Sequence, residues 1–409
     1  MQAHRRRSSS RADAANLRRR LLIGFTVLVL AIMAWRIIAV SLGELLQFSR
    51  PRAALAWNGR DGDALAVVAS GRMAQGDGAG AEQAARAALA VDPLNGRAVQ
   101  VLGLLAGAAG QTARADALMM QVDRLTKRNT VAEAWLFDLA MTGGRYSEAM
   151  DHADSLLRRR SGTTAKLLSV LVDTAGFAPA LPALAEKLGK SPPWRPLFFA
   201  AFGKSDGNID PAPLLAALDR AGTPLSAAEA QPLIAGMVRR GDYRGAVDFA
   251  RKFVPERGLM ADGDFEGRPG IAPFMWRFTA GDAGRAEIVA RENGGKALRV
   301  EPAARGKPGI LAQQTLVLPP GSYELSGRME KSRTGISGTA IRIDCVGRRG
   351  LTLFRGGDPV SQGQWQAFSG AFAVPSENCP AQTIEVLATG VVPAEGAISW
   401  YDELAIAAR

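Results

Sequence analysis

The sequence is poor in the residue types that build catalytic and metal sites. Its 409 residues include two His, His4 and His152, and two Cys, Cys345 and Cys379. A zinc site of the Cys/His type needs three or four such ligands. A Ser-His-Asp arrangement would have to use His152, which stands in a helical run and is typical of a helix surface. The stretch 76–80 is rich in glycine but lacks the lysine and the spacing of a phosphate-binding loop. We therefore expect no enzyme.

A basic patch is also missing from most of the chain, although the formal net charge is +11. Residues 1–20 contain seven Arg and one Asp, so most of this charge lies in the first twentieth of the sequence. The remainder shows no cluster of basic residues interleaved with aromatics, which is what nucleic-acid binding requires. We expect no nucleic-acid partner.

One long apolar run follows the basic leader. Residues 21–35 carry no charge, Arg36 interrupts, and apolar residues continue to Gly43. A spanning helix needs about 20 residues, and Arg36 can extend toward the outer interface. The sequence therefore predicts a basic cytoplasmic tail over residues 1–20 and a single transmembrane anchor over residues 21–43.

The orientation follows from Arg18, Arg19 and Arg20, which directly precede the run. Basic flanks stay in the cytoplasm, so the rest of the chain should face outward, which in a bacterium means the periplasm. A cleaved signal peptide is the alternative, with the small residues 39–41 as a weak cleavage site. Either interpretation exports the bulk of the chain.

Residues 51–256 show a regular period of 34 residues. Three sets of positions repeat with it: Val68, Leu102 and Leu136; Gly76, Gly110 and Gly144; Ala81, Ala115 and Ala149. The first set should pack one helix, the glycine should end it in a left-handed turn, and the alanine should lie where the next helix crosses. This pattern predicts a solenoid of tetratricopeptide (TPR) type.

The repeat is uneven along the chain. Leu233, Gly241 and Ala246 restore the internal spacing, whereas residues 163–221 predict helices without a readable register. The array could bind protein partners in a groove. Alternatively, it could consist of alanine-rich helical hairpins without one.

Residues 257–409 alternate with the period of strands between turn residues. The predicted strands cover residues 286–291, 296–300, 310–318, 323–331, 340–346, 351–354, 365–374, 384–388 and 398–406. Nine strands without an intervening helix indicate a β-sandwich of jelly-roll type. The fold class is therefore multidomain, with an anchor, an all-α solenoid and an all-β sandwich.

Two features of this module go beyond its fold. Cys345 alternates in phase with Ile341 and Ile343, so it should face the core and, in an oxidising compartment, form a disulfide with Cys379. Two separate thiols are the alternative. Asp402 is in phase with Trp400 and Leu404, and a carboxylate on a core face needs hydrogen bonds or a cation.

Glu266 is the natural acidic companion of Asp402, because it lies near the start of the module and Asp402 near its end. Such a pair suits a structural Ca²⁺, which takes oxygen ligands. Hydrogen-bonded carboxylates without a metal are the alternative.

Several segments resemble carbohydrate-binding modules of the cellulose- and xylan-binding families. They are Gly263-Asp264-Phe265-Glu266, Phe274-Met275-Trp276-Arg277, Pro320-Gly321-Ser322-Tyr323, Trp365 with Phe372-Ala373-Val374-Pro375, and Trp400-Tyr401-Asp402. The resemblance implies a jelly roll with a calcium site at Glu266 and Asp402. In its order of parts, the whole chain also resembles membrane-anchored TPR proteins of bacterial exopolysaccharide assembly systems.

Sugar rings stack on exposed aromatic faces, with polar side chains at their edges. The candidates are Trp276, Tyr323, Arg342 and Trp365, and Trp276 is the one least committed to the core because it lies outside any predicted strand. Core packing is the alternative for each aromatic, above all for Trp365.

The sequence thus predicts a scaffold whose repeats bind proteins of an envelope polysaccharide assembly system and whose sandwich binds glycan. A pure protein–protein adaptor is one alternative, favoured if the sandwich exposes no aromatic. A glycosidase or lyase is another, but it needs paired carboxylates in a cleft, and Glu266 and Asp402 lie at a structural seam.

Overall fold

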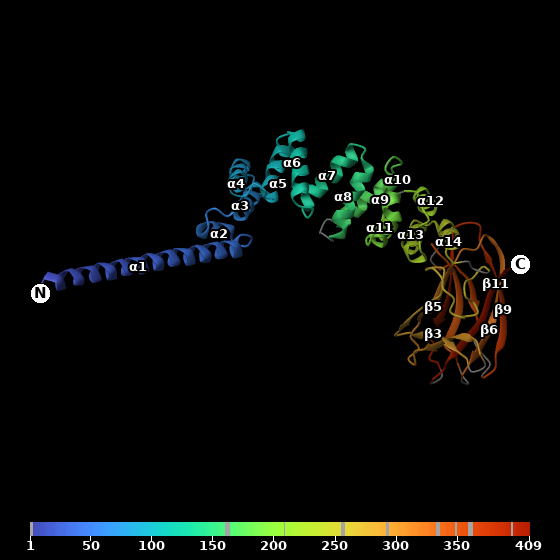
Figure 1. Ribbon diagram of the computed structural model, residues 1–409. Coiled ribbons are helices and arrows are strands. Elements are labelled where there is room, and N and C mark those ends of the chain that lie inside the picture. Colours follow the sequence, from blue (N-terminus) through green and yellow to red (C-terminus); the bar gives the residue numbers. More distant parts are fainter. Residues whose placement is uncertain are drawn as a thin grey trace. The chain divides into compact units, whose positions relative to one another are not determined.

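The computed structural model describes residues 3–159, 164–207, 209–254, 258–291, 294–332, 336–347, 350–358, 363–393 and 396–409, with side chains from residue 19 onward. The chain divides into two compact units, residues 1–161 and 162–409 (Figure 1). The first unit is helical, and the second contains further helices followed by a β-sandwich. This confirms the predicted fold class, while the predicted boundary at residues 256 and 257 lies outside the described residues.

Helix α1 (Ala3–Leu46) contains the apolar run. The most apolar 18 residues of its segment Arg19–Leu46 have a mean hydropathy of 2.4, and none of them is buried. At ~1.5 Å per residue such a segment is longer than the ~30 Å apolar layer of a bilayer. The helix is long and apolar enough to cross a membrane, and a signal sequence has the same properties.

Short helices complete the first unit. They are α2 (Pro51–Trp57), α3 (Gly62–Ala74), α4 (Gly78–Val91), α5 (Gly96–Ala108), α6 (Thr112–Leu125), α7 (Thr130–Thr142) and α8 (Tyr146–Arg158). Helices α3 and α4, α5 and α6, and α7 and α8 pack as successive pairs. Asp61, Asp77 and Asn95 cap three of the helices, each accepting a hydrogen bond from the backbone N–H three residues later.

The 34-residue period has the predicted structural meaning. Gly76, Gly110 and Gly144 have φ values of 81°, 72° and 71°, just after α3, α5 and α7. In each case the next N–H bonds back to a carbonyl five residues earlier, as in Asp77 to Arg72 at 3.0 Å, which is the Schellman ending of a helix. The alanines of the period are fully buried where the paired helices cross.

The second unit begins with six helices. They are α9 (Thr164–Ala175), α10 (Leu181–Gly189), α11 (Arg195–Lys204), α12 (Ala212–Arg220), α13 (Ala227–Arg239) and α14 (Tyr243–Ala250). Gly241 repeats the left-handed ending after α13, with a φ of 84°. Gln231 of α13 bonds both the N–H and the carbonyl of Ala272 in the sandwich, at 3.0 and 2.8 Å.

The sandwich consists of two antiparallel sheets. The strands are β1 (Arg277–Phe278), β2 (Ala280–Gly281), β3 (Gly284–Ala290), β4 (Lys296–Pro302), β5 (Gly309–Leu316), β6 (Gly321–Lys331), β7 (Thr339–Cys345), β8 (Thr352–Gly356), β9 (Gln366–Val374), β10 (Gln382–Ala388) and β11 (Ser399–Ala408). The five-stranded sheet has the order β1-β5-β10-β7-β8 and the six-stranded sheet the order β2-β3-β4-β11-β6-β9. All nine predicted strands are present, and β1 and β2 were not predicted.

Alternating burial along the strands separates an inner face from an outer one. On the five-stranded sheet Ile341, Ile343 and Ile384 are fully buried, and on the six-stranded sheet Leu298 and Leu325 meet them in one core cluster. The residues between them face outward. The outer faces of the two sheets are therefore the surfaces on which ligand-binding side chains can stand.

Strand β11 departs from the predicted phase. Its register with β6 shifts between Asp402 and Ala405, and Glu403 has a φ of 53°, so the strand contains a bulge. Before the bulge Tyr401 faces the core, and after it Leu404 does. The prediction that Trp400, Asp402 and Leu404 share the core face was therefore wrong, because one extra residue turns Trp400 and Asp402 outward.

Candidate functional site

Two tryptophans lie on the outer face of the six-stranded sheet. Trp400 of β11 pairs with Arg299 of β4 and with Glu330 of β6. Trp365 directly precedes Gln366, which pairs with Met329, so Trp365 comes opposite Glu330 on the far side of β6. With neighbouring strands about 4.8 Å apart, the two tryptophans stand about 10 Å apart across the sheet. Both side chains are half-buried.

Two arginines lie next to the ring of Trp365. The guanidinium of Arg291 lies 4.4 Å from the centroid of its ring, and that of Arg328 lies 5.7 Å away. Arg328 also reaches Glu403 at 3.4 Å. Within the described part of the chain, no aromatic ring or cation stacks on Trp400. The ring of Trp365 is thus partly covered by two guanidinium groups, whereas the half-buried ring of Trp400 has no such contact among the described residues.

Asp402 joins this group through Arg291. Its Oδ2 accepts a hydrogen bond from Arg291 Nη1 at 3.1 Å, and its Oδ1 accepts one from the Glu403 N–H at 2.8 Å. Burial raises the pKa of Asp402, and the Glu403 N–H and the Arg291 charge offset only part of that rise. The carboxylate therefore holds Arg291 over Trp365 by a hydrogen bond, although burial disfavours its charged form. We call Trp400, Trp365, Arg291 and Arg328, with Asp402, the tryptophan face.

The two predicted metal ligands, Glu266 and Asp402, each have other hydrogen-bond partners in the structure. Glu266 is exposed, its Oε1 accepts a hydrogen bond from the Lys296 N–H at 3.2 Å, and its backbone carbonyl accepts one from Lys296 Nζ at 2.9 Å. Asp402 has Arg291 as its partner, and a Ca²⁺ ion there would have to displace the guanidinium. Each acidic residue thus has its own cationic neighbour, and calcium binding stays a prediction.

Two of the predicted sugar-binding aromatics lie in the core. Trp276 is 4% exposed and its ring packs 5.4 Å from that of Phe265, so the prediction that it is exposed was wrong. Tyr323 is 5% exposed, stacks on Phe372 and donates its hydroxyl hydrogen to the Pro319 carbonyl at 2.8 Å. Neither ring can offer a face to a sugar, because sandwich residues cover both.

Arg342 and Trp365 are accessible, but they lie on different sheets. Arg342 stands on the outer face of the five-stranded sheet, where it binds Glu385 at 2.6 Å and Asp344 at 2.8 Å. Burial lowers the pKa of Arg342, but the hydrogen bond and charge of Glu385 outweigh it and raise the pKa above its usual value. The structure therefore does not bring the four predicted sugar-binding residues together, and of the aromatic candidates it leaves Trp365.

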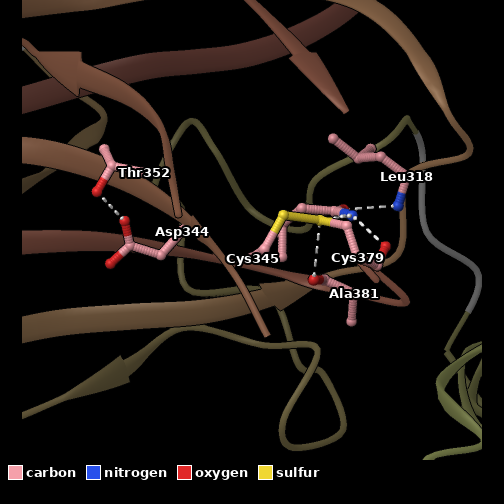
Figure 2. Close-up of a disulfide and its surroundings, with 7 residues drawn as sticks. Leu318, Asp344, Cys345, Thr352, Cys379 and Ala381 are labelled. Carbon is pink, nitrogen blue, oxygen red and sulfur yellow. Dashed lines mark hydrogen bonds between the residues drawn. A yellow bond between two sulfur atoms is a disulfide. The ribbon is translucent and has the colours of Figure 1, made fainter. Parts of the chain in front are cut away.

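The predicted disulfide is present. Cys345, at the end of β7, is bonded to Cys379 (Figure 2). Beside it, the side-chain amide of Gln382 accepts a hydrogen bond from the Leu318 N–H at 2.9 Å and donates one to the Cys379 carbonyl at 3.3 Å. The disulfide therefore links the loop before β10 to the C-terminal end of β7.

His152 is less exposed than predicted. Its Nδ1 lies 2.6 Å from the carboxylate of Glu133, a residue of α7 that is 3% exposed. The same carboxylate accepts a hydrogen bond from Ser155 Oγ at 3.0 Å and lies 3.5 Å from Arg159. Ser155 bonds the carboxylate and not the imidazole, so the group has no serine nucleophile next to a base. It is a buried polar link between α7 and α8.

Sequence reasoning missed Trp400, Arg291 and Arg328. Trp400 was assigned to the core because the bulge at Glu403 has no glycine to mark it. Arg291 ends a predicted strand and Arg328 alternates with core residues, so both were visible as outward positions. Nothing in the sequence showed that Arg291 and Arg328 would meet at Trp365, because the three residues lie far apart along the chain.

No protein-family model matches the sequence, and no curated protein is similar to it. Solved structures share parts of the fold. TmCBM61, in complex with β-1,4-galactotriose, is 15% identical, with a TM-score of 0.28 over 38% of this chain and 100% of its own. A structure described as "CBM4 structure and function" is 16% identical, with a TM-score of 0.28 over 36% of this chain and 98% of its own.

The helical region has a neighbour of its own. PilF from Pseudomonas aeruginosa is 15% identical, with a TM-score of 0.29 over 54% of this chain and 90% of its own.

Proposed function

We propose that the protein is a membrane-anchored, non-catalytic scaffold whose sandwich binds polysaccharide on the tryptophan face. The observation that carries this proposal is the pair of outward tryptophans on one sheet, with Trp400 open and Trp365 braced by Arg291 and Arg328. Flat aromatic rings provide apolar contact for the faces of sugar rings. Guanidinium and carboxylate groups at their edges can bond sugar hydroxyls.

The shape of this surface suits a chain better than a small molecule. The tryptophans stand about 10 Å apart across three neighbouring strands. The outward residues further along the edge strand β9, such as Ser369 and Ala371, are small and exposed. A polysaccharide that runs along β9 from Trp365 would therefore meet no bulky side chain at these positions.

The anchor part of the proposal rests on α1. Its apolar segment Arg19–Leu46 is preceded by further arginines, which favours retention of the N-terminal side in the cytoplasm. The sandwich would then lie in the periplasm, where the disulfide is stable. A tag at the C-terminus of the full chain should be digested by protease added to spheroplasts, whereas protection of the tag would contradict this orientation.

A binding role is favoured over catalysis by the state of the acidic residues. Asp402 and Glu385, the buried carboxylates on the two outer faces, are each bound to an arginine. A glycosidase needs one carboxylic acid and one free carboxylate on either side of the sugar bond. We infer that these groups position arginines instead of transferring protons.

The helical repeats supply the second half of the scaffold. We propose that they bind proteins of an envelope polysaccharide assembly system, as the order of anchor, TPR-like repeats and sandwich suggests. Affinity purification of the full chain from membranes, followed by identification of the co-purifying proteins, tests this part. Co-purification of proteins unrelated to polysaccharide would favour the adaptor without sugar binding.

Affinity electrophoresis tests the glycan part. The full chain in neutral detergent is run through gels that contain polysaccharide extracted from the source cell envelope. We expect retardation of the wild type and at least tenfold weaker binding of Trp400→Ala, a loss of about 1.4 kcal/mol. Arg355→Ala, an exposed change on the outer face of the other sheet, is the matched control and should bind like the wild type. Equal retardation of both variants would contradict the proposed site.

A further inference from the structure

A basic cavity lies in the first unit, next to the end of α1. It has a volume of about 570 Å³ and lies between the start of α2 and one face of α3. Its polar lining includes three arginines and its apolar lining two valines: Arg50, Arg52, Arg72, Val67 and Val68. None of the described residues that line it is acidic. A cavity of this composition favours an anionic ligand that also has an apolar part.

Two of the three arginines are available. Arg50 and Arg52 are exposed, and among the residues that the structure describes neither side chain has an ion pair or hydrogen bond. Arg72 is half-buried and donates one hydrogen bond from Nη1 to the Gly80 carbonyl at 3.2 Å, which leaves other guanidinium donors unused. Uncompensated guanidinium groups at one cavity suit phosphate, which accepts two parallel N–H bonds from each.

The cavity is held at the level where α1 would leave the bilayer. The rings of Trp35 in α1 and Trp57 in α2 lie 5.8 Å apart, and both are exposed, at 59% and 41%. Tryptophan concentrates at the boundary between the apolar layer and the lipid headgroups. The tryptophan pair joins the two helices next to Arg36, which should extend toward the outer interface, so α2 and the cavity at its start would lie on the headgroup side of the span.

The contact between α1 and α2 is close enough to fix this position. Ala39 and Ala54 are buried, and a Cβ on Gly43 would lie 3.1 Å from the Cβ of Asn58. Small residues let the backbones of two helices approach closely. The cavity therefore lies beside a close contact between α2 and the end of α1.

We propose that this cavity binds the phosphate headgroup of an anionic phospholipid from the leaflet that the end of α1 meets. The arginines bind the phosphate, and Val67 and Val68 contact the apolar part beyond it. The proposal rests on the membrane anchor of the proposed function and adds a lipid preference to it. Basic residues near an anionic surface change binding by about fivefold each, so three should give about a hundredfold.

Short-chain lipids test the proposal on the full chain in neutral detergent. Dioctanoyl phosphatidylglycerol, dioctanoyl phosphatidylcholine and inorganic phosphate are titrated separately, and bound ligand is counted by native mass spectrometry. We expect the phosphatidylglycerol to bind most tightly and the variant Arg50→Gln/Arg52→Gln/Arg72→Gln to lose about a hundredfold of that affinity. The control Arg86→Gln/Arg114→Gln/Arg124→Gln removes the same charge elsewhere in the unit and should keep it.

Equal binding of the two lipids by the wild type, or an equal loss in both triple variants, would overturn the proposal. Inorganic phosphate that binds as tightly as the lipid would also overturn it, because the ligand would then be a free anion. Flotation of the full chain with phosphatidylcholine vesicles distinguishes failure of the membrane anchor from failure of the lipid site. If the chain floats but binds the two short-chain lipids equally in the titrations, the lipid site alone is wrong. If it does not float, the anchor is wrong and the site falls with it.

Discussion

Arg291 lies over the ring of Trp365, 4.4 Å from its centroid, while its Nη1 bonds the carboxylate of Asp402 at 3.1 Å. The three residues come from β11 and from the ends of two other strands of one sheet. Asp402 holds the guanidinium of Arg291 in place, and this guanidinium packs against the ring of Trp365. Trp400 stands on the same face of the sheet. In the proposed function, these contacts form the surface on which a sugar chain would lie.

The first prediction concerns Trp276, which the sequence favoured as a sugar platform. Because its ring is buried against Phe265, Trp276→Ala should cost about 3–5 kcal/mol of unfolding free energy. Denaturant unfolding of the full chain measures this loss. Trp365→Ala, on the outer face, should cost clearly less and reduce polysaccharide retention instead. A large loss of unfolding free energy in Trp365→Ala, together with a loss of retention in Trp276→Ala, would contradict these two assignments.

The second prediction concerns the bridge between Cys345 and Cys379. The two are 34 residues apart in sequence, so the loop-entropy account gives about 4 kcal/mol for removal of the bridge by the double alanine variant. Thiol labelling of unfolded, unreduced protein should find no free cysteine. Two labelled thiols per chain would show that the bond does not form in the cell.

A third prediction follows from the raised pKa of Asp402. A group whose pKa is higher in the folded state stabilises the fold below its unfolded pKa and loses that contribution as pH rises through its folded value. The uncharged variant Asp402→Asn should therefore gain stability relative to the wild type as pH rises above 3.8, the ordinary value for an aspartate. Thermal melting across this range measures the difference. A relative loss as pH rises would show that the pairing with Arg291 outweighs the burial.

The fourth prediction concerns Glu133, which links α7 to α8. Glu133→Ala leaves Arg159 without its buried partner and should cost about 3–5 kcal/mol. Glu148→Ala is the matched control on the same helix pair, because Glu148 and Arg145 form an exposed ion pair worth about 0–1 kcal/mol. Similar small losses in both variants would mean that the buried group contributes no more than a surface pair.

The sequence was most informative where local rules decide the structure. The glycines at 76, 110 and 144 correctly predicted the helix endings. The alternation of Ile341, Ile343 and Cys345 correctly predicted the inner face of β7. The first signal depends on a repeat along the chain and the second on neighbouring residues, and neither requires knowledge of contacts between distant segments.

The candidate site depends on contacts that no local rule predicts. One extra residue at Glu403 turns Trp400 outward, and Arg291 reaches Asp402 across 111 positions of sequence. Trp276 lacked a strand pattern, and it was buried by packing against a loop residue, Phe265. The exposure of aromatic residues in irregular segments, such as Trp276, or in a strand with a bulge, such as Trp400, is therefore what the sequence could not decide.

The central claim is that polysaccharide lies on Trp400. Hydroxyl-radical footprinting of the full chain, with and without envelope polysaccharide, tests it directly by the oxidation of individual tryptophans. We expect bound polysaccharide to lower the oxidation of Trp400, and to leave unchanged that of Trp135, a half-buried tryptophan of the helical repeats. Unchanged oxidation of Trp400 at a polysaccharide concentration that retards the chain in gels would contradict the account.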